Sequence, residues 1–204
     1  MIGMNLRTSI VFVLLVTACG GGGGEDPGSG IDPRVARVDA FDAQRMRVLG
    51  DVGTGAIGMA STPDASLPIS GSVNFEGFTT IRVENPNQPL VLYGDTAVTI
   101  GFGGGAVTGT MDAFFGTNDL GDVVDYGGEI LIDAGSTTAG LTLDYGGALT
   151  EGVNTLVFDG TLEGLFLGDP LGAISASDLE AGVFYNGAPL DATVVLVAET
   201  VPPI

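Results

Sequence analysis

The sequence predicts an all-β fold: a single eight-stranded antiparallel β-barrel, preceded by a short helix and a flexible N-terminal tether. Three observations predict it. Eight short runs between residues 69 and 199 alternate apolar and polar side chains, as half-buried strands do. Clusters of Gly, Asn, Asp and Pro separate these runs. No helical pattern long enough to cover a sheet follows them, and a sheet without cover loses its edges by closing on itself.

The first 18 residues are predicted to lie outside the fold. Arg7 precedes the apolar run 10–16, which is too short to span a bilayer and is typical of a secretory signal. Small residues then lead into the only cysteine of the chain, in Val16-Thr17-Ala18-Cys19. This pattern resembles the lipobox of bacterial lipoproteins; an ordinary signal peptide with a chance cysteine is the alternative.

The lipobox resemblance implies cleavage between Ala18 and Cys19 and attachment of acyl chains, such as palmitate, to Cys19. Two or three such chains hold a protein stably on a membrane. Gly20, in place of Asp after the cysteine, implies an outer-membrane destination, on the periplasmic face or at the cell surface. Residues 19–30, which begin with Cys19 and five glycines, are predicted to be the lipidated tether.

Residues 31–66 are predicted to form a helix and a linker. Asp32 is a suitable N-cap and Pro33 a suitable first helical residue, and apolar residues recur at helical spacing over 33–49. The helix carries four arginines, whereas Arg82 alone accompanies the 20 acidic residues from Asp51 onward. Such complementary charge favours docking of the helix on its own acidic domain; binding of a partner or of anionic lipid is the alternative.

Residues 67–204 are predicted to form the barrel. The apolar positions that define its inner face are Val73, Phe75, Ile81, Val83, Val98, Ile100, Phe102, Val107, Met111, Ala113, Phe115, Tyr126, Ile130, Ile132, Leu141, Leu143, Tyr145, Leu149, Leu156, Phe158, Leu162 and Phe166, with less regular runs over 173–186 and 192–199. Eight strands enclose just enough room for side chains, so we expect the aromatic residues to fill it. A transmembrane barrel is the rival, but the tether and the non-aromatic C-terminus favour a soluble barrel.

The composition excludes most catalytic chemistry. The chain has no His and no Lys, and its net charge is −19. These absences remove Ser-His-Asp and Cys-His systems, Schiff bases and the P-loop lysine. One cysteine without histidine cannot build a zinc or iron–sulfur site, and the acidic surface repels nucleic acid. We therefore expect no enzyme activity and no cofactor.

Two types of carboxylate site remain possible. Asp119, Asp122 and Asp125 gather near a turn, where oxygen ligands could hold Ca²⁺, although the spacing matches no known calcium loop and a solvated acidic hairpin is the simpler interpretation. A pair of carboxylates could run glycoside hydrolysis, but no motif distinguishes one pair. An apolar pocket inside the barrel, as in lipocalins, is a further alternative.

Several segments carry a resemblance to one family. Residues 67–77 (LPISGSVNFEG) are similar to the opening strand of the transferrin-binding-protein-B-like β-barrel domain. Residues 93–102 with 105–110, residues 162–168, and residues 186–187 with 195–199 are similar, in the same order, to its next hairpin, a late strand and its closing hairpin. The resemblance implies a surface lipoprotein with a non-catalytic barrel. The chain has one barrel in place of paired lobes and no Lys-rich surface, so transferrin capture is not expected.

The sequence thus predicts a lipid-anchored envelope lipoprotein whose barrel binds a protein or ligand at the outer membrane. A lipocalin-like carrier of a small apolar ligand and a carboxylate-dependent hydrolase are the alternatives. No binding residue and no partner beyond the membrane can be named from the sequence.

Overall fold

A computed structural model describes residues 32–137 and 140–201. The predicted signal peptide, the cleavage site between Ala18 and Cys19, and the tether lie outside these residues. Helix α1 (Pro33–Leu49) has the predicted bounds. Its N-terminus is capped as the sequence indicates, because Asp32 Oδ1 accepts a hydrogen bond of 2.9 Å from the Arg34 backbone N–H. Gly50 follows the helix with a φ of 75°, a conformation that glycine adopts without strain.

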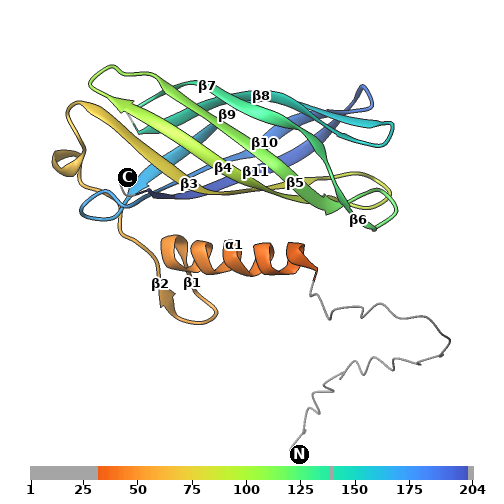
Figure 1. The fold of residues 1–204 in the computed structure, drawn as a ribbon, viewed down its shortest axis with the longest axis horizontal. Helices are drawn as coiled ribbons and strands as arrows, with labels where there is room; N and C mark the ends of the chain where they lie inside the picture. Colours follow the sequence, from red (N-terminus) through yellow and green to blue (C-terminus); the bar gives the residue numbers. More distant parts are fainter. Residues whose placement is uncertain (1–31, 138–139, 202–204) are drawn as a thin grey trace, which may run out of the picture. The chain divides into compact units, whose positions relative to one another are not determined.

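The predicted eight-stranded antiparallel barrel is confirmed (Figure 1). Its strands are β3 (Gly71–Val83), β4 (Leu90–Phe102), β5 (Val107–Thr117), β7 (Gly127–Ser136), β8 (Leu141–Glu151), β9 (Asn154–Leu167), β10 (Ala173–Tyr185) and β11 (Ala188–Thr200). Barrel strands adjacent in the chain pair with one another. The short strand β6 (Val123–Asp125) adds to β5, and β7 pairs with β5 beside it. Strand β11 returns to β3, and this pairing closes the sheet without a free edge.

One cluster of buried residues fills the barrel. Six of the eight strands contribute side chains of one parity throughout, as the alternation predicts, whereas in β5 and β10 the parity changes at a bulge. Phe75, Phe158 and Ile130, for example, are all less than 2 % exposed. Six of the seven aromatic residues expected inside belong to this cluster, namely Phe75, Phe102, Tyr126, Tyr145, Phe158 and Phe166. The expectation of an inner face packed with aromatic and aliphatic side chains is therefore confirmed for these positions.

Phe115 is the exception among the aromatic residues, because it packs outside the barrel wall, and Ala113, also expected inside, is exposed. The pairing of β4 with β5 shifts between Tyr93 and Asp95, and Ala113 has a φ of 49°. This β-bulge reverses the alternation, so that Phe114 enters the inner cluster and Phe115 packs outside. Gly94 makes room for the inverted residue, since a Cβ at this position would lie 2.5 Å from the Phe114 ring.

The segment predicted as a linker has structure of its own. Strands β1 (Gly50–Asp51) and β2 (Ala56–Ile57), of two residues each, form a short antiparallel hairpin after the helix. Thr62 then bonds to the end of β9 through its backbone N–H and its hydroxyl, and a short 3₁₀ turn (Asp64–Ser66) precedes β3. These contacts join distant parts of the chain, which explains why Gly- and Thr-rich composition alone indicated only flexibility.

Candidate functional site

The inside of the barrel offers few polar groups to a ligand. Thr79 and Thr96 are both buried, and their hydroxyls bond to each other at 2.7 Å. Tyr126 donates its hydroxyl to the Thr117 carbonyl at 2.8 Å. Because these interior polar groups satisfy one another and apolar side chains surround them, the interior has the character of a core.

Helix α1 docks on the outer wall of the barrel through its arginines. Arg34 makes a two-pronged ion pair with Asp125, with contacts of 2.7 and 3.0 Å. Arg37 Nη2 lies 3.0 Å from Asp95 Oδ2, and Arg47 Nη2 lies 2.6 Å from Glu199 Oε2. The segregation of charge in the sequence therefore corresponds to an internal contact, as the docking interpretation expected.

An apolar strip completes this contact. The ring of Phe41 on the helix stacks on Phe78 of β3, with centroids 4.9 Å apart, and Val48 is fully buried nearby. On the wall, Phe115 lies 5.8 Å from Tyr93, again stacked. The outward aromatic side chains are thus covered by the helix, which accounts for apolar residues on both faces of β3, β4 and β5.

A groove remains between the first half of α1 and the wall. It has a volume of about 430 Å³ and is lined mainly by apolar side chains, among them Val35, Val38, Val91 and Tyr93. Arg34 lies at its rim, but its guanidinium is already paired with Asp125. The groove could accept an apolar group and offers no unpaired cation to hold an anionic head.

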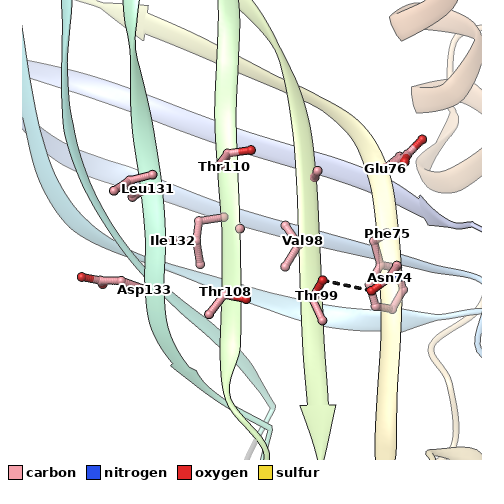
Figure 2. Close-up of a pocket in the computed structure, with 12 residues that line it drawn as sticks. Asn74, Phe75, Glu76, Val98, Thr99, Thr108, Thr110, Leu131, Ile132 and Asp133 are labelled. Carbon is pink, nitrogen blue, oxygen red and sulfur yellow. Dashed lines mark hydrogen bonds between the residues drawn. The ribbon is translucent and has the colours of Figure 1, made fainter.

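A wider trough crosses the outer wall of β3, β4, β5 and β7 (Figure 2). Its volume is about 610 Å³, and small side chains such as Thr108 and Thr110 form its floor. Glu76 on β3 and Asp133 on β7 lie at its opposite ends, where three strand spacings separate their backbones by about 14 Å or more. The trough therefore does not place two carboxylates on neighbouring strands, the arrangement that a glycosidase pair would need.

The three acidic residues considered for calcium are not brought together as one group in the described part of the chain. Asp125 is held by Arg34, and Asp122 donates its backbone N–H to Asn118 Oδ1 at 2.9 Å. Among the described residues, no group of three acidic, cysteine or histidine side chains is placed to hold a metal ion. The acidic hairpin is thus part of the wall to which the helix docks.

Asp178 is a polar residue that the sequence did not single out. It lies at a bulge in β10, where its carboxylate accepts the Tyr145 hydroxyl at 3.0 Å and the Glu180 backbone N–H at 3.3 Å. The Tyr145 hydroxyl and the Asp178 carboxylate meet beside Gly160, which has no side chain. A Cβ at Gly160 would lie 2.7 Å from the Tyr145 hydroxyl oxygen. The irregular alternation over 173–186 was the available signal, but it did not show where the strand bulges.

No helix in the described ranges is long and apolar enough to cross a membrane. Comparison with protein-family models, with curated protein sequences and with solved structures finds no match for this chain.

Proposed function

We propose that this chain is a lipid-anchored protein of the bacterial envelope whose barrel binds a partner without catalysis. The observation that carries the proposal is the packed interior of the barrel. Because apolar side chains occupy the inside, a partner has the outer wall and the loops to contact. The same observation disfavours the lipocalin-like alternative, which needs an empty cavity inside the barrel.

The membrane attachment is argued from the N-terminal sequence. Ala18-Cys19 after a signal-like apolar run, followed by a glycine-rich stretch, supports acylation of Cys19 and an outer-membrane location. Helix α1 then connects this stretch to the barrel, and its ion pairs hold the start of the folded part against the wall. The transferrin-binding-protein-B-like resemblance supports the same reading, a tethered binding module.

The absence of catalysis is argued from composition. Without His or Lys, the chain has only carboxylates, hydroxyls and arginines for acid–base work. All five arginines of the described ranges are engaged in ion pairs with carboxylates. A binding role requires none of the missing groups.

Replacement of the single cysteine tests the anchor. In a bacterial host that processes lipoproteins, the wild-type chain should enter the membrane fraction and incorporate a clickable palmitate analogue, because Cys19 carries the lipid. Cys19→Ala should leave the membrane fraction and stay unlabelled. Thr17→Ala, which keeps a small residue before the cleavage site, should behave as the wild type. A Cys19→Ala protein that remains on membranes to the wild-type extent would refute the lipidated anchor.

A further inference from the structure

Exposed apolar side chains of the barrel wall gather on two adjacent strands. Val157 and Leu165 on β9 are 43 % and 57 % exposed, and Leu179 and Phe184 on β10 are 68 % and 52 % exposed. Of the other six long strands, only β7 carries a comparably exposed large apolar residue, Leu131, within the described ranges. Apolar residues concentrated on one wall of a barrel with a polar outer face indicate a contact surface.

A bulge hollows this wall. Ser177 pairs with Glu163 and Val183 pairs with Phe158, so β10 carries one more residue than β9 between these pairs. The hollow has a volume of about 580 Å³, with Gly164 and Ser177 among the residues that line it and Leu165 and Leu179 beside them. The wall therefore has both the apolar side chains and the concave shape that a partner side chain needs.

The hollow is also negatively charged. Glu163, Asp178 and Glu180 line it, and none of the ion pairs within the described ranges includes them. Asp178 accepts hydrogen bonds from neutral groups, the Tyr145 hydroxyl and the Glu180 backbone N–H, which leave its charge uncompensated. The described arginines lie elsewhere, so these three carboxylates face solvent without a cationic partner from the described part of the chain.

Charge complementarity indicates which kind of molecule binds in the hollow. A second copy of the chain would bring its own excess of carboxylates, and an anionic lipid surface or a nucleic acid would be repelled in the same way. We infer that the hollow of β9 and β10 is a docking surface for a basic segment of another protein, with Lys or Arg among its apolar residues. Its apolar side chains cover Leu165 and Leu179, and its cations meet Glu163, Asp178 and Glu180.

A synthetic peptide of alternating lysine and leucine tests this inference on the full-length chain. Wild-type protein should bind it, and Leu165→Ser/Leu179→Ser and Glu163→Gln/Glu180→Gln should each weaken the affinity about tenfold, the effect of losing a contact worth about 1.4 kcal/mol. Peptides of alternating glutamate and leucine, or of lysine and serine, should bind at least tenfold more weakly. Circular dichroism and thermal unfolding confirm that each variant is folded.

Strand β7 supplies a matched control, because Glu129, Leu131 and Asp133 alternate along its exposed face. Leu131→Ser and Glu129→Gln/Asp133→Asn should change the affinity less than twofold. Equal losses in both sets would mean that the peptide responds to overall charge, and the inference would fail. It would also fail if wild-type protein did not bind the peptide, or if it dimerised through the hollow in sedimentation experiments. The inference rests on the proposed binding role, but not on the lipid, so Cys19→Ala should leave peptide binding unchanged.

Discussion

The guanidinium carbon of Arg37 lies 4.6 Å from the ring centroid of Phe115. The same side chain pairs with Asp95 and donates a hydrogen bond of 3.0 Å to the carbonyl of Ala113, the residue with positive φ in β5. One helical residue thus covers the aromatic ring that the bulge turns outward and bonds to the bulge itself. Arg37 of α1 therefore contacts both residues that the bulge displaces, Ala113 and Phe115.

Arg37→Ala should lower the free energy of unfolding by roughly 1–2 kcal/mol, because it removes a cation–π contact, an ion pair and a hydrogen bond at a partly exposed site. Urea unfolding followed by circular dichroism measures the change. Arg45→Ala is the control on the same helix, since Arg45 pairs with Asp42 and Asp51 and, within the described ranges, forms no ion pair with a barrel carboxylate. A loss as large in Arg45→Ala would show that helix propensity, not docking, is being measured.

Phe41→Ala should detach the helix before the barrel unfolds. Phe41 is 9 % exposed and stacks on Phe78, so truncation removes the main apolar contact of α1 and should cost the docking equilibrium roughly 2–3 kcal/mol. Hydrogen exchange should then accelerate at the backbone amides of α1 and remain slow in β8 and β9.

Val35→Ala controls for the helix, because Val35 is half exposed. It should leave exchange in α1 within about threefold of the wild type. If Phe41→Ala accelerated exchange equally in β8 and β9, the helix and barrel would unfold as one unit, contrary to this prediction.

Most of the fold could be predicted because it follows from local alternation. Leu141, Leu143 and Tyr145 face inward since a strand alternates its side chains, and Asp32-Pro33 begins a helix since both residues suit its first turn. Phe115 could not be placed correctly. Its direction depends on a bulge at Ala113, a residue type that carries no signal for positive φ.

The bulge can be tested through Gly94. Gly94→Ala would place a Cβ 2.5 Å from the buried ring of Phe114 and should cost roughly 1–3 kcal/mol, the usual penalty for overpacking a core. Gly182→Ala is the matched control on β10, because no atom lies within 4 Å of its Cβ position. It should change the free energy of unfolding by less than about 0.5 kcal/mol or raise it slightly. Thermal unfolding measures both variants. Equal losses of stability in Gly94→Ala and Gly182→Ala would contradict the position given to Phe114 by the bulge.

The candidate site could be predicted far less well than the fold. The acidic residues around Asp119 suggested a calcium site because they are close in sequence, but Asp125 is bound by Arg34 of the helix. The hollow of β9 and β10 depends on Glu163 and Glu180, which approach one another through strand pairing across a bulge. Spacing along the chain cannot reveal that proximity, because the pairing register is set by the whole barrel.

Alkaline pH should destabilise the barrel through its buried tyrosines. Burial raises the pKa of Tyr145, and the Asp178 carboxylate raises it further; burial also raises the pKa of Tyr126, as does Glu151. An unfolded tyrosine releases its proton near pH 10, whereas these folded tyrosines keep theirs. Stability is therefore fully present below about pH 10 and falls as pH rises, by up to roughly 1.4 kcal/mol per pH unit for each tyrosine.

The composition makes this effect easy to measure, because the chain has no lysine to titrate in the same range. Urea midpoints between about pH 8 and pH 11.5 should fall in the wild type as the unfolded state loses its tyrosine protons. Tyr126→Phe/Tyr145→Phe should be less stable at pH 8, because Tyr126 loses its hydrogen bond to Thr117 and Tyr145 loses its bond to Asp178. Its midpoint should nevertheless depend much less on pH above 10. An unchanged slope in the double variant would show that other groups cause the alkaline loss.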